Sequence, residues 1–300
     1  MKWLELSVDA PSEFVEPLSH IFYKYGSGGV SVESKAGFNP DEGEKPPISD
    51  TMTIRTYIRI DENTIERRGN IEVGVKLVNH LYPIEPLRER EMEEEDWESN
   101  WKEHFHPIRV GNRLVICPTW RAYETCLDEV LILLDPGMAF GTGHHPTTRM
   151  CMELIERTVK GGESVLDLGS GSGILSITAV KMGAKKSIGL EIESNAVTVS
   201  KDNSAVNGVS ENITIFEGTL PHSQITGNFF DMVLANISAK VLIDLSELIA
   251  RSVKPEGRLI LSGVLQQSLA DVQDVMNANE IQFDEVIREG DWVAILASRH

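Results

Sequence analysis

The stretch "VLDLGSGSGIL", residues 165–175, decides the fold of this chain. A short apolar run precedes three glycines at positions 169, 171 and 173, and a helix-forming segment follows them. Glycines at the end of a strand permit a tight turn and a close approach of a ligand, with the N-terminus of a helix behind them. The stretch therefore predicts a strand, a ligand-binding loop and a helix in succession.

The spacing of these glycines indicates which ligand the loop binds. A dinucleotide loop has the spacing GxGxxG, and its third glycine lets the helix pack around a pyrophosphate. Here the spacing is GxGxG, and Asp167 stands two positions before Gly169. That carboxylate disfavours an anion, whereas a ligand with an ammonium group and no phosphate, such as S-adenosylmethionine, suits it. The alternative is a glycine-rich turn with a purely structural role.

Two polar residues follow at the ends of later predicted strands. Glu191 lies 22 residues after Gly169, where a carboxylate accepts hydrogen bonds from ribose hydroxyls. This position favours a nucleoside without choosing between NAD and S-adenosylmethionine. Asn236 ends the strand "FDMVLANI", at the location that holds a polar residue near the incoming nitrogen in amino-methylating enzymes. A simple helix cap is the alternative role of Asn236.

The C-terminal two thirds of the chain alternates short apolar strands with helices. Strands are predicted at residues 164–168, 186–192, 213–218, 230–237 and 257–264, with helices at 173–183, 195–208 and 238–253. This alternation is typical of a parallel, doubly wound sheet covered on both faces. Only Gly290 and Asp291 separate residues 281–289 from 292–298, so these segments predict an antiparallel hairpin. Residues 108–118 predict a second strand pair around a tight Gly-Asn turn.

The N-terminal region, residues 1–93, predicts a small α+β domain. Its elements follow the order β-α-β-β-α-β, which is the ferredoxin-like pattern, and it holds no candidate catalytic cluster. Residues 94–107 carry an acidic run with Trp97 and Trp101 and predict a helical linker to the domain of residues 108–300. His104 and His106 have no further ligands at a plausible spacing, so we expect no metal site.

The composition restricts the classes of partner and compartment. The chain has 46 acidic and 28 basic residues, a net charge of −18, which argues against sequence-independent nucleic-acid binding. An acidic surface favours a basic partner, although many proteins are acidic for solubility alone. No apolar run approaches the roughly 20 residues of a membrane span, and the N-terminus does not have the pattern of a signal peptide. With three widely spaced cysteines, we expect a reduced, cytoplasmic compartment.

Several stretches together are specific enough to indicate a family. "DPGMAFGTGHHPTTRMCMELIE" (135–156), "VLDLGSGSGIL", "GLEIESNAV" (189–197), "ANISA" (235–239) and the segment from "DWESNWKEHFHPIRVG" to "LVICPTW" resemble the ribosomal protein L11 methyltransferases, PrmA. The resemblance in motifs covers residues 93–300. The N-terminal domain resembles the family mainly in its architecture and its place in the chain. It implies a class I methyltransferase domain with a Rossmann-like, seven-stranded mixed sheet, in the α/β class, behind the small ferredoxin-like domain.

The resemblance also implies an activity and a set of site residues. The methyl donor is S-adenosylmethionine, the acceptors are lysine and N-terminal amines of the basic ribosomal protein L11, and the N-terminal domain recognises this substrate. We expect a cytoplasmic, monomeric protein-lysine N-methyltransferase with no stable nucleic-acid partner and no membrane. Asn236 is the candidate catalytic residue, and no general base is assigned. The candidate cofactor residues are Phe140, Gly141, Thr148, Asp167, Gly169, Gly171, Glu191 and Asn236.

Some features leave alternatives open. The family usually has Asp-Ile-Asp-Pro where this chain has Glu-Ile-Glu-Ser from Glu191, so the carboxylate reaches one methylene further. Thr148 has the alternative role of beginning a helix that runs through Glu156. The "ANISA" stretch lacks the Asn-Pro-Pro-aromatic motif of many nucleic-acid amino methyltransferases. The alternative functions are a methyltransferase for RNA or a small molecule, and a non-catalytic cofactor-binding ribosome-assembly protein.

Overall fold

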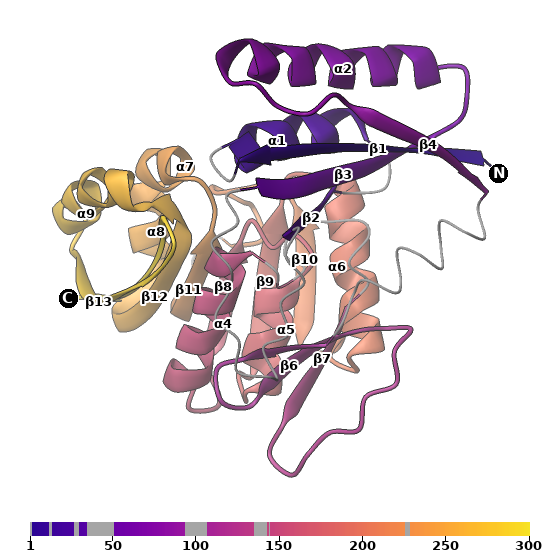
Figure 1. Ribbon diagram of the computed structural model, residues 1–300. Helices are drawn as coiled ribbons and strands as arrows, with labels where there is room; N and C mark the ends of the chain where they lie inside the picture. The colour runs from indigo at the N-terminus through magenta and orange to yellow at the C-terminus, as the bar shows by residue number, and fades with distance from the viewer. Residues whose placement is uncertain are drawn as a thin grey trace. The chain divides into compact units, whose positions relative to one another are not determined.

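A computed structural model of the 300-residue chain describes residues 2–11, 14–26, 30–34, 51–93, 107–134, 143, 145–225 and 229–300 (Figure 1). The chain divides into two compact units, Met1–Phe105 and His106–His300. Residues 35–50 and nearly all of the predicted linker at 94–107, with its two tryptophans and two histidines, lie outside the described residues.

The N-terminal unit has the predicted order of elements within its described residues. These are β1 (Lys2–Pro11), α1 (Val15–Tyr25), β2 (Val30–Ser34), β3 (Thr51–Arg59), α2 (Thr64–Leu81) and β4 (Arg88–Glu93). The strands form one antiparallel sheet in the order β2-β3-β1-β4. Both helices lie on the same side of this sheet (Figure 1).

Alternation along β1 explains why the helices pack on that side. Leu4, Leu6, Val8 and Ala10 share one face because side chains alternate along a strand, and all four are buried. They form one apolar cluster with residues of α1 and α2, which include the fully buried Phe22. The opposite face of β1 carries Glu5, Ser7 and Asp9 along its middle, so the continuous apolar surface is the one that meets the helices.

The C-terminal unit is built on a seven-stranded mixed sheet in the order β10-β9-β8-β11-β12-β14-β13. Its strands are β8 (Ser164–Leu168), β9 (Lys186–Glu191), β10 (Ile213–Glu217), β11 (Phe230–Asn236), β12 (Val253–Leu265), β13 (Ile281–Glu289) and β14 (Trp292–Arg299). The first five pair in parallel, and β14 pairs antiparallel with both β12 and β13. The predicted α/β class, the seven-stranded mixed sheet and the closing hairpin are therefore confirmed.

Helices cover both faces of this sheet (Figure 1). One face packs against α4 (Pro146–Thr158), α5 (Ile174–Lys181) and α6 (Ser194–Val206), and the other against α7 (Ala239–Asp244), α8 (Ser246–Ser252) and α9 (Leu269–Ala278). The strands supply residues to both clusters, because a strand buried on two faces has apolar side chains on both. The single helix predicted for residues 238–253 is instead two helices, which meet at Leu245.

A small second sheet joins β5 (Ile108–Val110), β6 (Leu114–Pro118) and β7 (Val130–Leu134). The β5–β6 hairpin matches the predicted strand pair, whereas β7 is a strand that the sequence pattern does not predict. Two side chains, one in α5 and one directly after α6, form hydrogen bonds with the backbone of β7. Asn207 accepts from the Leu133 amide and donates to its carbonyl, and Lys181 donates to the carbonyl of Leu131. These bonds occupy backbone groups that an open strand edge leaves unpaired.

Candidate functional site

The glycine loop follows β8 at the carboxyl edge of the large sheet, as the sequence predicts. The backbone amides of Gly169 and Ser170 donate to the carbonyl of Leu190 at 2.9 and 3.1 Å, which holds the loop against the end of β9. Gly169 has a φ of 73°, a left-handed conformation that residues with a side chain rarely adopt. The loop ends at Gly173, the residue before α5, so the N-terminus of that helix faces the same edge.

Gly169 also makes room for a neighbouring strand end. A Cβ atom on Gly169 would lie 2.5 Å from Cγ2 of Ile237, the residue after β11. A Cβ on Gly263 would come within 2.3 Å of the carbonyl oxygen of the same Ile237. Two glycines, one in the loop after β8 and one in β12, therefore flank one residue. The requirement for glycine at position 169 comes from packing within the protein as well as from any ligand.

Asp167 is fully buried and only half satisfied by hydrogen bonds. Its Oδ2 accepts from the backbone amide and the hydroxyl of Ser176, at 3.1 and 2.7 Å. Its Oδ1 is buried and has no partner among the described residues. Burial raises the pKa of this carboxyl to about 6, with Glu191 acting in the same direction and the Ser176 bonds opposing. An unsatisfied buried acceptor beside a glycine loop is a position where a ligand donor completes the set.

Glu191 connects the end of β9 to the glycine loop. Its side chain is 8% exposed, and its Oε2 accepts from the amide of Gly171 at 2.8 Å. Its Oε1 accepts from the amide of Glu193 at 3.0 Å. The longer Glu side chain at this position thus bonds with the loop itself. Each carboxylate oxygen has a second lone pair, so the group retains capacity to accept from ribose hydroxyls.

Asn236 ends β11 beside the loop, because its neighbour Ala235 pairs with Leu168 at the end of β8. Its Nδ2 donates to Oγ1 of Thr148 at 3.4 Å, across 88 positions of sequence. Its Oδ1 is buried and lacks a hydrogen-bond partner within the described part of the chain. Thr148 lies in the first turn of α4 and is fully buried. Both alternatives for Thr148, the helix start and the site, are therefore compatible with its position.

The structure brings most of the predicted site residues to one edge. Asp167, Gly169, Gly171, Glu191 and Asn236 all lie at the carboxyl ends of adjacent strands or in the loop between them. Thr148 joins them from α4 through its contact with Asn236. The remaining two predicted residues, Phe140 and Gly141, lie outside the described residues, as does most of the segment 135–144.

Sequence reasoning misses two residues at this edge, Ser176 and Ile192. Ser176 holds Asp167 and contacts the hydroxyl of Ser187 at 2.9 Å. Ile192, directly after Glu191, has a large apolar side chain that is 69% exposed. A serine within an apolar helix and one aliphatic residue after a strand carry little signal in a single sequence. Contacts across the sheet edge are needed to find them.

Other features of the described chain hold no comparable set of groups. Within those residues no group of three or more His, Cys, Asp or Glu side chains is placed to hold a metal ion. No helix in the described part is long and apolar enough to cross a membrane.

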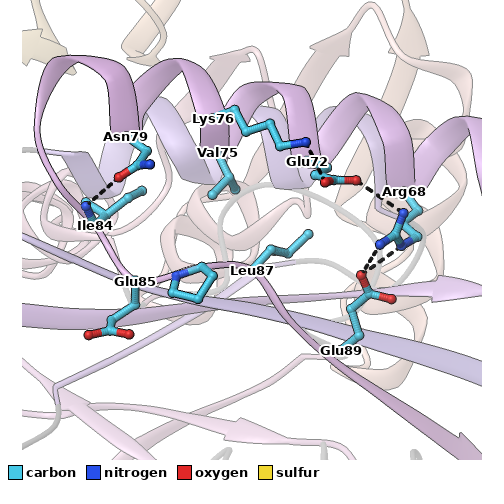
Figure 2. Close-up of a pocket in the computed structure, with 10 residues that line it drawn as sticks. Arg68, Glu72, Val75, Lys76, Asn79, Ile84, Glu85, Leu87 and Glu89 are labelled. Atoms are coloured by element: carbon cyan, nitrogen blue, oxygen red, sulfur yellow. Dashed lines mark hydrogen bonds and ion pairs between the residues drawn. The ribbon is translucent and has the colours of Figure 1, made fainter.

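A groove of about 300 Å³ lies in the N-terminal unit, between α2 and residues 84–89 (Figure 2). Four of its ionic groups, on Arg68, Glu72, Lys76 and Glu89, pair with one another. Lys76 contacts Glu72 at 2.7 Å, Glu72 contacts Arg68 at 3.2 Å, and Arg68 Nε donates to Glu89 at 2.8 Å. Figure 2 also shows Asn79 accepting from the amide of Ile84. Because these charges are mutually compensated, we assign the groove no ligand.

The fold and the edge residues together define a class of protein. A doubly wound sheet in this strand order, closed by an antiparallel hairpin and carrying a glycine loop after β8, is that of the Rossmann-like methyltransferases. The chain belongs to the family described as Ribosomal protein L11 methyltransferase (PrmA), which matches residues 2–300. The resemblance inferred from sequence motifs is therefore confirmed.

Individual relatives agree with this assignment. A protein of Chloroflexus aurantiacus named Ribosomal protein L11 methyltransferase is 39% identical over 322 aligned residues, which cover 99% of this chain and 98% of the relative. A protein of the same name from Vibrio parahaemolyticus is 37% identical, with 98% of both chains covered. The crystal structure of a ribosomal protein L11 methylase from Lactobacillus delbrueckii has a TM-score of 0.61 and 33% identity, and covers 65% of this chain and 100% of that one.

Proposed function

We propose that this chain transfers methyl groups from S-adenosylmethionine to amines of ribosomal protein L11, namely lysine side chains and the N-terminal amine. The observation that carries the proposal is the edge of the large sheet. There a glycine loop and the acceptor Glu191 come together with two buried oxygens, on Asp167 and Asn236, that have no partner among the described residues. The chain is a member of the L11 methyltransferase family.

The described residues fit S-adenosylmethionine chemically. Asp167 offers a carboxylate oxygen that has no partner in the described part of the chain to a ligand that carries positive charge, and Glu191 offers acceptor capacity for ribose hydroxyls. Ile192 offers an exposed apolar side chain next to Glu191, suited to one face of a purine ring. Gly169 and Gly171 keep the loop backbone bare, and the family resemblance adds Phe140, Gly141 and Thr148 to this group. When bound, the cofactor supplies a methyl group activated by a sulfonium.

The protein must also present the acceptor amine in its neutral form. A lysine amine has an unperturbed pKa of about 10.4, so it is mostly protonated at neutral pH. Exclusion of water lowers that pKa, because desolvation disfavours the cation. We assign to Asn236 the orientation of the neutral amine, since its Oδ1, which has no partner among the residues that the structure describes, can accept a hydrogen bond from an amine N–H. We assign no residue as a dedicated base.

We assign recognition of the protein substrate to the N-terminal domain. Residues 1–105 contain 22 acidic and 12 basic residues, so this third of the chain carries −10 of the total charge of −18. Such a surface attracts a basic protein over a Debye length of about 8–10 Å. In this proposal the domains are residues 1–93, a linker of 94–107 and the catalytic domain 108–300, in a cytoplasmic, monomeric enzyme.

Label transfer tests the function. The chain is incubated with S-adenosylmethionine labelled in its methyl group and with separated ribosomal proteins and ribosomal RNA. We expect label in L11 alone, on lysine and N-terminal amines by mass spectrometry. Label in RNA, or calorimetric binding of the cofactor with no transfer to any component, overturns the proposal. A chain shortened to begin at Glu93 should keep the cofactor affinity and lose transfer to L11, and full transfer by this variant contradicts the recognition role.

A further inference from the structure

We propose that one side of α2 is a docking surface for the protein substrate, and that it binds an apolar segment flanked by lysine or arginine side chains. This inference rests on the proposed function, because it takes the partner to be the basic protein that the chain methylates. It goes further by naming the surface and the chemistry that the surface recognises. We call this surface the α2 stripe, which consists of residues at a regular spacing of four, namely Ile65, Gly69, Val73, Leu77 and Leu81.

The α2 stripe faces solvent. Residues four apart lie near one another along one side of a helix, because an α-helix has 3.6 residues per turn. The four large side chains of the stripe are between 57% exposed, at Val73, and 84% exposed, at Ile65. No other helix in the described ranges has more than one large apolar side chain that is exposed. The stripe is therefore a continuous apolar feature of one helix, not a set of scattered surface residues.

The core of the N-terminal unit uses a different side of α2. Ile71, Val75 and Val78 are buried and belong to the apolar cluster between the helices and the sheet. The groove of Figure 2 uses a further side, since none of the residues that line it belongs to the α2 stripe. Replacing a residue of the α2 stripe should therefore leave the fold of the unit intact.

Gly69 interrupts the α2 stripe with a gap. A glycine inside a helix lowers the stability of the helix relative to alanine, so its presence needs a reason. Gly74 has such a reason, because a Cβ there would lie 2.7 Å from Cδ1 of Ile21. Outside the backbone of its own helix, Gly69 has no atom of the described chain within 4 Å of an added Cβ. The gap gives an incoming side chain a place between Ile65 and Val73.

The charges beside the α2 stripe are unevenly compensated. Every lysine and arginine of α2 contacts a carboxylate, in the pairs Arg67–Asp61, Arg68–Glu72, Arg68–Glu89 and Lys76–Glu72. Glu66 lies in the first turn of α2, about two turns before Val73 on the same side, and Glu62 lies in the turn before the helix. Both are exposed, and neither forms an ion pair with a residue that the structure describes. The surface therefore offers apolar side chains next to uncompensated negative charge.

These features fit a basic protein better than a second copy of this chain. A second copy would bring an α2 stripe with the same acidic residues, and each chain carries a net charge of −18. Like charges oppose association, whereas opposite charges speed the encounter and orient the partners. An apolar segment with neighbouring lysine or arginine side chains can fill the gap at Gly69, cover Leu77 and pair with Glu66. The α2 stripe is therefore suited to the substrate and not to self-association.

Binding of L11 to the full-length chain tests this inference without the cofactor. Leu77→Gln removes an apolar contact from the α2 stripe, and Leu127→Gln is the matched control at an exposed leucine of the C-terminal unit. We expect Leu77→Gln to weaken the affinity for L11 about tenfold by calorimetry, as for a central interface residue. Single-turnover transfer at saturating L11 and S-adenosylmethionine should stay within about twofold of the parent. Leu127→Gln should change neither quantity.

Gly69→Leu separates docking at a shaped surface from simple apolar attraction. Leucine is a better helix former than glycine, so the N-terminal unit of this variant should resist denaturant better than that of the parent. If the gap receives a side chain of the substrate, the same change should weaken the affinity for L11 about tenfold. A surface that binds without a fixed geometry would instead gain affinity from the added leucine. Glu66→Gln should weaken the affinity about threefold at about 50 mM salt and hardly at about 500 mM, because salt screens charges.

Unchanged affinity of Leu77→Gln for L11, an equal loss in Leu127→Gln, or tighter binding by Gly69→Leu overturns the inference. A lower midpoint of denaturation in Leu77→Gln shows that another part of the chain covers the surface. A dimer of the parent that Leu77→Gln dissociates, measured by sedimentation, shows that a second copy covers it, and both results also overturn the inference. A parent that binds L11 through the α2 stripe but transfers no label to it contradicts the proposed function and not the docking surface. A parent without measurable affinity for L11 overturns the docking surface whatever the label transfer shows.

Discussion

Two buried aspartates, one in each unit, differ in how completely their carboxylates are satisfied. Asp9 of the N-terminal sheet is 2% exposed and accepts a bidentate pair from Arg88, at 2.7 and 2.8 Å. Thr53 donates to the same carboxylate at 2.7 Å. Asp167 of the C-terminal sheet has only Ser176 as a donor, and its second oxygen has no partner in the described chain. Burial is similar at the two sites, and the difference lies in the donors.

This difference separates a structural group from one available to a ligand. A buried charge that is paired and fully hydrogen-bonded holds strands together, because breaking it leaves an uncompensated charge. The Asp9 bond also acts on its partner, since it raises the pKa of Arg88 above the usual value. At Asp167 the two Ser176 bonds offset the cost of burial only in part, and the pKa of the carboxyl rises to about 6. A buried acid in this state is characteristic of functional sites.

The largest expected effect comes from removing the partner of Asp9. Arg88→Met removes the bidentate donor of the buried Asp9 carboxylate, and we expect a loss of about 3 kcal/mol in the stability of the N-terminal sheet. Hydrogen exchange of the β1 and β3 amides measures this loss locally. Arg251→Met, which breaks the exposed Arg251–Glu247 pair on α8, is the matched control and should cost less than about 0.5 kcal/mol. Equal costs in the two variants contradict the structural role of the Asp9 pair.

A second effect concerns the glycine that packs on Ile237. Gly169→Ala adds a Cβ at a φ of 73° and 2.5 Å from Ile237 Cγ2, so we expect about 2 kcal/mol of lost stability with a weaker affinity for S-adenosylmethionine. Chemical denaturation and calorimetry measure the two quantities. The double variant Gly169→Ala/Ile237→Ala removes the contact and should recover part of the stability. No recovery indicates that backbone strain or the ligand, rather than Ile237, sets the requirement for glycine.

Gly169 also shows how far the sequence alone can lead. Spacing along the chain predicts the strand, the loop and the helix, because these are local properties of residues 164–183. The positions of Glu191 and Asn236 follow equally well, since parallel strands end at the same edge of a sheet. The contact of Gly169 with Ile237, however, joins positions 68 residues apart. From the sequence alone, a glycine that is required by such a contact cannot be told from a glycine that is required by a ligand.

Other features depend on contacts that no local pattern encodes. The sequence pattern does not predict that β7 belongs to a second sheet. Part of the β7 backbone forms hydrogen bonds with Asn207 and Lys181, which lie far along the chain. The break at Leu245 divides a segment whose apolar spacing favours one helix. Thr148 has two plausible roles in the sequence, and only its contact with Asn236 relates the helix start to the strand end. The roles proposed for the site residues stay predictions until their variants are measured.

The contrast between the aspartates also predicts a dependence on pH. The folded pKa of Asp167 is about 6, above its ordinary value of 3.8, so the folded state retains a proton that the unfolded chain releases between these values. Its contribution therefore lowers the free energy of unfolding as the pH rises through this window, by about 2 kcal/mol between pH 4 and 7. Denaturation of the parent and of Asp167→Asn across this range measures the difference. An identical pH dependence of the two proteins contradicts the raised pKa.

Cofactor affinity gives a separate measurement on the same pair of proteins. A cationic ligand near Oδ1 favours the ionised carboxylate, so the affinity of the parent for S-adenosylmethionine should rise between pH 5 and 7. The affinity of Asp167→Asn should change less over this range, because the amide does not titrate. An equal rise in both proteins assigns the pH dependence to other groups.

The smallest expected effect is at Glu191, a third carboxylate that lies between the two extremes. Both of its oxygens accept from backbone amides, yet each has a lone pair to spare for a ribose hydroxyl. Glu191→Ala removes the acceptor for Gly171 as well as that for the ligand, so we expect S-adenosylmethionine to bind about 1–2 kcal/mol more weakly by calorimetry. Glu191→Gln keeps one acceptor oxygen and should lose less. The control is the exposed neighbour Glu193, whose side chain makes no capping hydrogen bond to α6. Glu193→Ala should leave the affinity for S-adenosylmethionine unchanged. If Glu191→Ala binds as tightly as the parent, Glu191 resembles Asp9 in serving the structure alone.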